Sequence, residues 1–406
     1  MKHFFAALLA LILSAPVFAQ AEGESFTDWL NDFRPRLVAS GASPQTVSAM
    51  LDGLEPNMIV IERDQTQPEF VRPLWEYLDI AASERRVSDG RNALRENHVT
   101  FGAIEDGLGV PREIVAAIWG LESSYGAITG NHDVVQSLAT LAWEGRRRTW
   151  AEAQLIAVAR MLDNGYAFRE ELTGSWAGAM GQTQFIPETY LARAIDFDGD
   201  GRRNIWTDYG DALASTANLL SQAGWTADVP PAVEVVVPDD FDLSSWTPDQ
   251  QRMTAEWSTR GITRADGEAW SADLNMRAAR LILPAGLHGP GFLTYSNFGA
   301  IKRYNNSTSY ALGVWLLSER LAGRGQIHQS WPLDNPPITR SQTQEMQQAL
   351  VDLGYDPGGV DGIFGPNTRR ALMAFQRQRG ELADGYAGRL MYDAVIAARN
   401  ARQAGE

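Results

Sequence analysis

The chain has 406 residues, 44% of them hydrophobic, a formal net charge of −15 and no cysteine. This charge argues against nucleic acid or an anionic membrane surface as the main partner. The missing thiols exclude disulfides, thiolate metal sites and the cysteine on which a bacterial lipid membrane anchor is built, and the length suits two or three domains.

The first residues have the pattern of a secretory signal. The segment "MKHFFAALLALILSAPVFAQAEG" contains an early Lys2, an apolar stretch and small residues at Ala19 and Ala21. This pattern is typical of a cleaved leader rather than a membrane span. We therefore expect a signal peptide over residues 1–19, with cleavage after Ala19 or Ala21, and a soluble, monomeric protein of the periplasm.

The next two hundred or so residues predict a helical body. Between Phe26 and about Leu220, apolar residues recur at spacings of three and four, and Gly or Pro stands at several ends of these runs. Four runs show the pattern most clearly: "FTDWLNDFRPRLVASG", "PQTVSAMLDGL", "FVRPLWEYLDIAAS" and "WAEAQLIAVARMLDNG".

One carboxylate interrupts an apolar helical stripe in this body. In "IVAAIWGLESSYG" (114–126), helical spacing puts Glu122 in line with Val115, Ile118 and Tyr125, beside Trp119. Burial there would raise the pKa of Glu122 toward neutrality and make it a proton donor at physiological pH. Two alternatives are an ion pair with an arginine of "GRRR" (145–148) and a position at a frayed helix end.

The segment "GSWAGAMGQTQFIPETY" (174–190) combines small residues with hydroxyl and amide groups at Ser175, Gln182 and Gln184. Small residues let the backbone approach a ligand closely, and such polar groups suit an uncharged polymer such as a glycan. The alternative is a purely structural glycine-rich turn.

The segment "DFDGDGRRNIW" (196–206) has the start of an EF-hand calcium loop. Asp196, Asp198 and Asp200 alternate, a glycine stands at the sixth position, and Arg202 offers its backbone carbonyl at the seventh. The twelfth position is Thr207 rather than the usual glutamate, so Asp208 or Asp211 would have to close the loop from further along the chain. The alternative is an acidic surface turn without an ion.

The pattern changes after Gly224. The runs "AVEVVVP", "ARLILPAG" and "GFLTYSNF" predict short strands, with a helix over "TPDQQRMTAEW" (247–257), and thus a small α+β insertion. Tyr304, Asn305 and Tyr310 in "RYNNSTSY" then present aromatic and amide groups that suit sugar rings, although Asn and Ser before a helix are also ordinary caps.

The Pro-rich residues 330–340 predict a linker, and amphipathic helices beyond it predict a separate small module.

Taken together and in this order, these segments resemble the lytic murein transglycosylase B family. The resemblance includes "DQTQPEF" (64–70), "GLESSYG", "SLATLAWEGRRR" and the three segments just described, and it covers nearly all of the chain before residue 330. The last module, with "LGYDPGGVDGIFGPNTRRALMAFQ" (353–376), resembles the common peptidoglycan-binding domain. HExxH, GxSxG and Walker motifs are missing from the sequence, which argues against other hydrolase and nucleotide chemistries.

The resemblance implies a mainly α fold: a lysozyme-like catalytic domain over 24–329, a linker over 330–340 and a three-helix peptidoglycan-binding domain over 341–400. It implies cleavage between N-acetylmuramic acid and N-acetylglucosamine in peptidoglycan, with Glu122 as the catalytic residue and a structural Ca²⁺ at the aspartate loop. The implied glycan contacts are Ser175, Gln184, Tyr304, Asn305 and Tyr310, and the implied calcium ligands are Asp196, Asp198, Asp200 and Arg202, with Asp208 or Asp211 closing the loop. One departure is Leu219, where the family pattern has a tyrosine.

A single glutamate suits an intramolecular reaction. A hydrolysing glycosidase usually needs two carboxylates, whereas one suffices if the C6 hydroxyl of the muramic acid attacks its own C1 and leaves a 1,6-anhydro end. The alternatives are a muramidase that hydrolyses the same bond and a non-catalytic protein that only binds the wall.

Overall fold

The computed structural model describes residues 24–65 and 72–405. The expected signal peptide and residues 66–70 of the "DQTQPEF" motif lie outside these ranges. Within them, no helix is both long enough and apolar enough to cross a bilayer.

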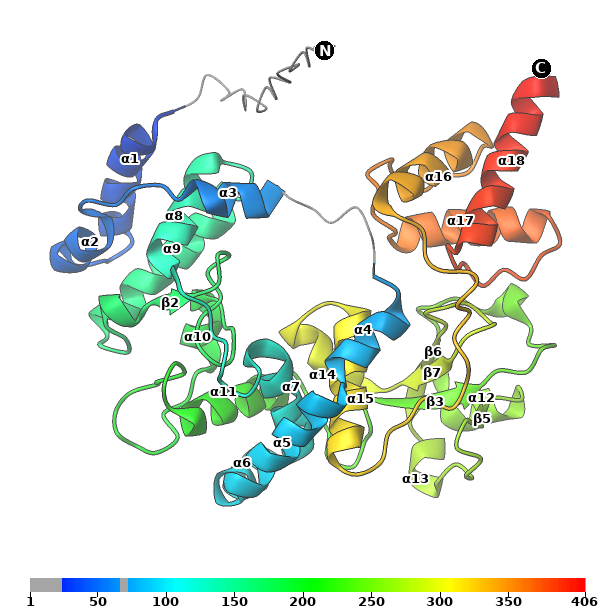
Figure 1. Ribbon diagram of the computed structural model, residues 1–406, viewed down its shortest axis with the longest axis horizontal. Helices are drawn as coiled ribbons and strands as arrows, with labels where there is room; N and C mark the ends of the chain where they lie inside the picture. The colour runs from blue at the N-terminus through cyan, green and yellow to red at the C-terminus, as the bar shows by residue number, and fades with distance from the viewer. Residues whose placement is uncertain (1–23, 66–71, 406) are drawn as a thin grey trace, which may run out of the picture.

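Two arms of structure are joined by a helical base (Figure 1). The sheet insertion and the C-terminal helices form the second arm. The first arm consists of helices whose apolar faces pack on one another, with Trp29, Phe33 and Leu37 fully buried. These helices are α1 (Phe26–Ala39), α2 (Pro44–Leu51), α3 (Met58–Gln65), α8 (Val134–Glu144) and α9 (Arg148–Asp163). The arm is stabilised by a buried contact in which Glu152 accepts hydrogen bonds from Trp29 (3.1 Å) and Arg36 (2.5 and 2.9 Å).

The base contains the helix that carries Glu122. This helix, α7 (Arg112–Ser123), packs against α15 (Thr308–Leu321), α5 (Glu84–Glu96) and α11 (Tyr209–Gln222). The other helices of the base are α4 (Leu74–Ala81), α6 (His98–Leu108), α10 (Pro187–Arg193) and α14 (Ser296–Tyr304). A short antiparallel pair, β1 (His132–Asp133) with β2 (Thr173–Gly174), and a 3₁₀ turn (Arg169–Glu171) lie between the base and the first arm.

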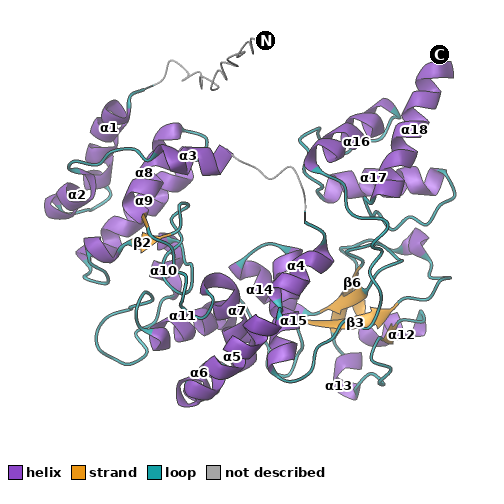
Figure 2. Cartoon of the chain, viewed as in Figure 1, coloured by secondary structure: helices purple, strands orange, loops and turns teal. Residues whose placement is uncertain are grey.

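The insertion is an antiparallel sheet with short helices at its side (Figure 2). Its strands lie in the order β4 (Gln251–Met253), β6 (Ala278–Ile282), β7 (Gly291–Thr294), β3 (Ala232–Val236) and β5 (Thr263–Arg264), with α12 (Thr254–Thr259), α13 (Ala272–Asn275) and a 3₁₀ turn (Leu243–Ser245). Phe292 faces the base, where its ring meets Trp315 of α15 edge-on at 5.5 Å between centroids. Leu281 and Leu293 point to the other face and form a second apolar core.

The structure differs from the sequence-based expectation for residues 247–257. The prediction of one helix there is wrong in its first half, because Gln251–Met253 pairs with β6 as an edge strand and the helix begins only at Thr254. Strand pairing with a segment more than twenty residues away overrides the local helical pattern.

The C-terminal module is a three-helix unit with its own core. Leu350, Leu372, Phe375 and Val395 are buried between α16 (Arg340–Asp352), α17 (Pro366–Gln378) and α18 (Arg389–Gly405). Ala371 also belongs to this core, and Leu353 packs at its edge, partly buried. The mainly α fold with an α+β insertion and a helical C-terminal module is therefore confirmed.

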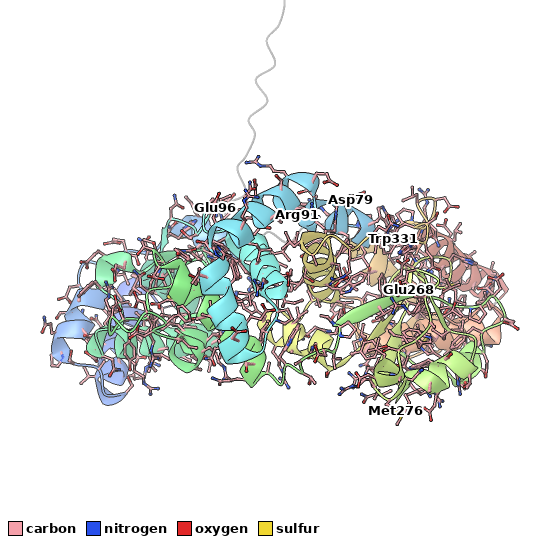
Figure 3. All side chains as sticks on the ribbon, turned by 90° about the horizontal axis from the view of Figure 1, so that it is seen from below. Asp79, Arg91, Glu96, Glu268, Met276 and Trp331 are labelled. Carbon is pink, nitrogen blue, oxygen red and sulfur yellow. The ribbon has the colours of Figure 1, made fainter. Side chains whose placement is uncertain are left out.

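The module docks on the sheet insertion. Met373 and Ala383 belong to the second apolar core, and the Asp384 carboxylate accepts a hydrogen bond from the backbone N–H of Leu287 at 3.1 Å. The segment expected to be a linker contacts the structure on both sides of it: Trp331, labelled in Figure 3, packs against Trp75 of α4 at 5.9 Å between ring centroids, and Ile338 belongs to the module's core. The two units therefore meet through side-chain contacts as well as through the chain.

Candidate active site

Glu122 lies one residue before the end of α7, at a sharp backbone turn. Ser124 and Tyr125 both adopt left-handed conformations, with φ of 51° and 60°, and their N–H groups bond the carbonyls of Gly120 and Trp119 at 3.2 and 3.3 Å. Non-glycine residues in this region cost about 1–3 kcal/mol each and persist only where the surroundings enforce them.

Packing of the Tyr125 ring enforces this turn. The ring meets Trp119 edge-on at 5.6 Å between centroids, and its hydroxyl donates to the carbonyl of Arg86 at 2.8 Å. It fits because Gly90 and Gly120 have no side chains: a Cβ at Gly120 would lie 2.6 Å from the ring, and one at Gly90 would collide with the hydroxyl. The glycines thus fix the end of the helix that carries Glu122.

The Glu122 carboxyl has an apolar setting and one hydrogen-bond partner. Val115 and Ile118 on its stripe are fully buried, and the Tyr310 hydroxyl donates to Glu122 Oε1 at 2.6 Å. Burial raises the pKa of Glu122 to about 7, although the hydrogen bond from Tyr310 acts in the opposite direction. The pKa rise predicted from the helical stripe is therefore present.

The ion-pair alternative for Glu122 is wrong. Arg146 and Arg147 pair with Asp64, and Arg148 pairs with Glu24 at 2.9 Å. Over residues 24–65 and 72–405, no acidic or basic side chain forms a hydrogen bond or ion pair with Glu122. The carboxyl group is thus neither neutralised by a cation nor paired with a second acid.

Three tyrosines from three helices surround Glu122. Tyr304 of α14 stacks on Tyr310 of α15 at 6.4 Å between centroids and an angle of 16°, and its hydroxyl donates to the carbonyl of Thr183. Tyr77 of α4 lies against Gly313 of α15, the helix that carries Tyr310; burial raises its pKa, and the charge of Glu122 adds to the rise. Sequence reasoning missed Tyr77, because a tyrosine within an amphipathic helix is an ordinary core residue until its neighbour is known.

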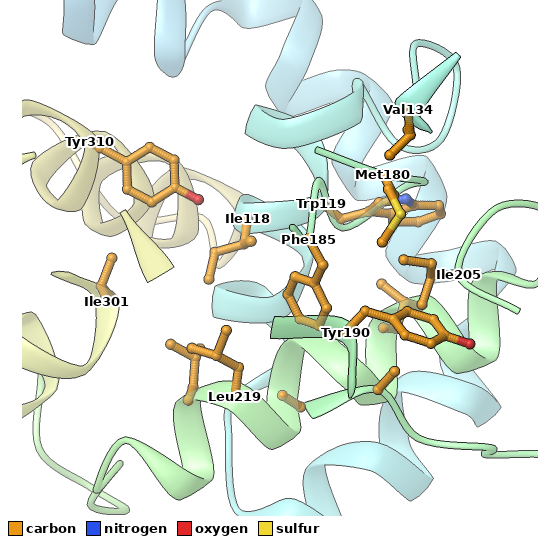
Figure 4. Packing of buried hydrophobic residues seen from close by; sticks show 14 of the residues in the cluster. Ile118, Trp119, Val134, Met180, Phe185, Tyr190, Ile205, Leu219, Ile301 and Tyr310 are labelled. Carbon is orange, nitrogen blue, oxygen red and sulfur yellow. The ribbon is translucent and has the colours of Figure 1, made fainter. Parts of the chain in front are cut away.

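The glycine-rich segment forms part of the wall beside Glu122. Gln182 is buried; it accepts from Trp119 Nε1 at 2.9 Å and donates to the carbonyl of Trp206 at 3.2 Å. Gln184, with φ of 50°, donates to the carbonyls of Thr129 and Gly181 at 3.0 and 2.9 Å. Figure 4 shows the apolar side of this wall, where Phe185 and Leu219 pack near Ile118.

The residues predicted to contact glycan do not all lie together near Glu122. Tyr304, Tyr310 and Glu122 form one group, and Gln184 lies beside the Thr183 carbonyl that Tyr304 bonds. Ser175 holds its own loop, its Oγ accepting from the N–H groups of Ala177 and Ala179 at 3.3 and 3.1 Å. Asn305 is exposed at the end of α14, and its side chain has no hydrogen-bond partner in the described part of the chain.

The aspartate loop brings three carboxylates together. One oxygen each from Asp196, Asp198 and Asp211 lie within 4.8 Å of one another. Asp211 is 1% exposed and accepts from the N–H groups of Phe197 (2.7 Å) and Asn204 (2.6 Å). Burial raises the pKa of Asp211 because it disfavours the charged carboxylate. A bound cation would stabilise that charged form.

The other predicted ligands play different parts in this geometry. Asp208 caps α11 by accepting from the N–H of Asp211 at 3.0 Å. Asp200 lies outside the group of three and accepts from the N–H of Arg202 at 2.7 Å. The Arg202 side chain turns away from the carboxylates to pair with Glu171 at 2.7 Å, so only its backbone could serve an ion. This oxygen-rich arrangement fits Ca²⁺.

The loop is connected to Glu122 through the glycine-rich segment. Ile205 accepts from the N–H of Gln182 at 2.8 Å, and Trp206 bonds the side chain of the same residue, which in turn holds Trp119. The aspartates themselves do not touch Glu122. The loop is therefore joined to the residues beside Glu122 by hydrogen bonds to Gln182.

Comparison with known proteins agrees with this geometry. The transglycosylase SLT domain model matches residues 25–319, and a peptidoglycan-binding domain model matches residues 339–395. The chain belongs to the SLT-domain transglycosylase family. The resemblance to lytic murein transglycosylases and the lysozyme-like fold class inferred from it are thereby confirmed.

Individual relatives support the same assignment. The chain is 32% identical over 220 residues to the membrane-bound lytic murein transglycosylase B of Escherichia coli K12, an alignment that covers 53% of this chain and 58% of that protein. It is 45% identical to SltB3 of Pseudomonas aeruginosa, determined in complex with NAG-anhNAM-pentapeptide, with a TM-score of 0.89 over 92% of this chain and all of that one. The E. coli lytic transglycosylase SLT35, determined in complex with calcium, is 26% identical, with a TM-score of 0.63 over 74% of this chain and 95% of that one.

Proposed function

We propose that the protein is a lytic transglycosylase that cleaves the β-1,4 bond between N-acetylmuramic acid and N-acetylglucosamine in peptidoglycan and leaves 1,6-anhydro-muramic acid ends. The single observation that carries the proposal is the solitary Glu122 carboxyl, with its pKa near 7 and no second acid in contact. Hydrolysing glycosidases use a second carboxylate, and among the described residues no other carboxylate contributes to the shifted pKa of Glu122. The SltB3 complexes with muropeptides support the choice of substrate.

In the proposed reaction Glu122 acts twice. Its protonated carboxyl first gives a proton to the glycosidic oxygen, so that N-acetylglucosamine leaves as an alcohol while the N-acetyl group of the muramic acid supports the positive charge at C1. The Glu122 carboxylate then takes the proton of the C6 hydroxyl, whose oxygen bonds to C1. No water is consumed, Glu122 is protonated again, and Tyr310 stabilises its charged form between the steps.

Mass spectrometry of muropeptides released from purified sacculi tests this function. A transglycosylase releases anhydro ends that are one water lighter than the reducing ends made by a muramidase. Hydrated ends as the main product would establish the muramidase alternative. Sacculi left intact by folded protein that still binds them would establish the non-catalytic alternative.

Tyr310→Phe is expected to move the pH profile. Because the reaction starts from protonated Glu122, wild-type activity should fall as the pH rises through about 7. The Tyr310 hydroxyl lowers the pKa of Glu122, so its removal should raise that pKa, shift the descending limb to more alkaline pH and lower kcat. Tyr304→Phe is the matched control, since its hydroxyl bonds Thr183 instead. If activity falls at the same pH in Tyr310→Phe and Tyr304→Phe, the role of Tyr310 is contradicted.

The same proposal includes a structural Ca²⁺ held by Asp196, Asp198 and Asp211, with Asp200 and the Arg202 carbonyl as further ligands. The three converging carboxylates support it, as does the calcium complex of SLT35. When bound, the ion would neutralise these carboxylates and fix the loop that bonds Gln182. The glycan contacts at Ser175, Gln184, Tyr304, Asn305 and Tyr310 also remain proposals.

The proposed setting is the periplasm, which the signal-like first residues support. The catalytic domain would extend over 24–329 and a peptidoglycan-binding domain over 341–400, with residues 330–340 between them. We propose a monomer whose partners are the glycan strands and stem peptides of the wall.

A further inference from the structure

Two adjoining pockets lie where the sheet insertion, the helical base and the C-terminal module meet. One has a volume of about 460 Å³ and the other about 400 Å³, and both are lined by Pro248, Asp249 and Arg369. We call the pair the basic groove. Its charged lining residues are Arg280, Lys302, Arg369, Arg370, Arg377 and Asp249.

The charge of this groove is opposite to that of the protein. The chain carries −15 overall, yet five basic side chains and one acidic one line these pockets. A third pocket, of about 650 Å³ beside β3 and β5, shows the contrast: its Arg264 and Arg324 are paired with Asp266 and Glu319. A concentration of one sign of charge in a concave site raises the local concentration of ligands of the other sign.

Most of these cations have no anionic partner. Arg280, Lys302 and Arg377 make no side-chain hydrogen bond or ion pair with any residue in the described ranges. Arg369 donates to the carbonyl of Gly385 at 3.1 Å, and Arg370 bonds the amide of Asn367, so neither meets a carboxylate directly. The groove therefore offers donors that an anionic ligand could satisfy.

One end of the groove is lined by neighbours in the chain of a residue that contacts Glu122. Thr308 and Ser309 line it and directly precede Tyr310, which bonds Glu122. Lys302 lies on α14, two residues before Tyr304, and Leu74 begins the helix that carries Tyr77. This end of the groove is therefore the one nearest to Glu122, and the end that carries Arg369, Arg370 and Arg377 lies on the C-terminal module.

We infer that the basic groove binds the carboxylates of peptidoglycan stem peptides. The inference rests on the proposed function, in which muramic acid lies at Glu122. The lactyl group of that sugar carries a peptide whose glutamate, diamino acid and terminal alanine bear carboxylates, and guanidinium and ammonium groups are their natural partners. The enzyme then prefers peptide-bearing glycan to peptide-free glycan, and the docked module supplies part of the preference.

The test compares kcat/KM on peptide-bearing glycan strands and on strands stripped of peptide by an amidase. The variant combines Arg280→Gln, Lys302→Gln and Arg377→Gln, and avoids Arg369, which already donates to the Gly385 carbonyl within the module. The control combines Arg85→Gln, Arg95→Gln and Arg389→Gln, which remove the same charge from exposed positions that do not line the groove. The groove variant should lose about tenfold in kcat/KM on peptide-bearing strands.

The outcomes separate the two proposals. A loss confined to peptide-bearing strands, with the control unchanged, supports the groove. Equal losses on both substrates, or no loss on either, overturn it. Cleavage of peptide-free strands to anhydro products by the wild type tests the proposed function on its own. A second readout, calorimetric binding of isolated stem peptide to Glu122→Gln protein, needs no activity; salt-sensitive binding that the groove substitutions weaken supports the inference, and unaffected binding overturns it.

Discussion

Glu122→Gln is expected to abolish turnover while leaving the fold and glycan binding intact. The amide keeps the shape of the side chain and can still accept the hydrogen bond from Tyr310, but it can neither give nor take a proton. General acid or base catalysis contributes about 10² to 10⁴ per step. Because one residue performs both steps, activity in the variant should fall below detection in a muropeptide-release assay.

Glu113→Gln is the matched control for this change. Glu113 lies in the first turn of the same helix, so its substitution removes the same charge from α7 without touching the site. Its activity should stay close to wild type, and both variants should melt like the wild type. Full activity in Glu122→Gln would remove this residue from the mechanism.

Removal of calcium is expected to lower the melting temperature markedly. An ion present at a hundredfold excess over its Kd stabilises the folded state by about 2.7 kcal/mol, and each kcal/mol corresponds to about 2–4 °C in domains of 150–250 residues. Some activity should persist without the ion at low temperature, since the aspartates do not contact Glu122. Thermal scans with calcium and with chelator provide the measurement.

Variants of the loop identify the closing ligand. Asp211→Asn and the exposed Asp198→Asn should each lose most of the calcium-dependent shift, because each removes a converging carboxylate. Asp208→Asn should keep the shift, since asparagine caps a helix as well as aspartate does and Asp208 is occupied with that role. A wild-type melting curve that ignores both calcium and chelator would refute the metal site.

The local features of this protein could be read from its sequence, and the contacts between distant segments could not. The apolar stripe around Glu122 was predictable because helical spacing fixes which side chains share a face. Tyr304 and Tyr310 could be singled out only as aromatic groups that suit sugar rings, and Tyr77 was missed, because the approach of α4 and α14 to α15 depends on packing between helices. The strand Gln251–Met253 formed against local preference for the same reason.

The docking of the C-terminal module on the sheet insertion could not be predicted from the sequence either. The amphipathic pattern of α17 predicts one buried face, and Leu372 and Phe375 occupy it. Met373 is buried on another side only because the sheet insertion covers it. No periodicity within the module contains that information, so a Pro-rich segment was expected to separate two independent units.

The glycine cradle around Tyr125 also limits how this sequence can diverge. A single methyl group at Gly120 has no room while the ring is present, and Gly90 is bounded by the same ring and by Leu321. Shortening Tyr125 alone would leave an unfilled space and an unbonded Arg86 carbonyl. The three positions are therefore epistatic: each change is harmful alone, and a viable route to another solution must alter the tyrosine and its glycines together. Mutant libraries that vary them one at a time should return only the starting residues.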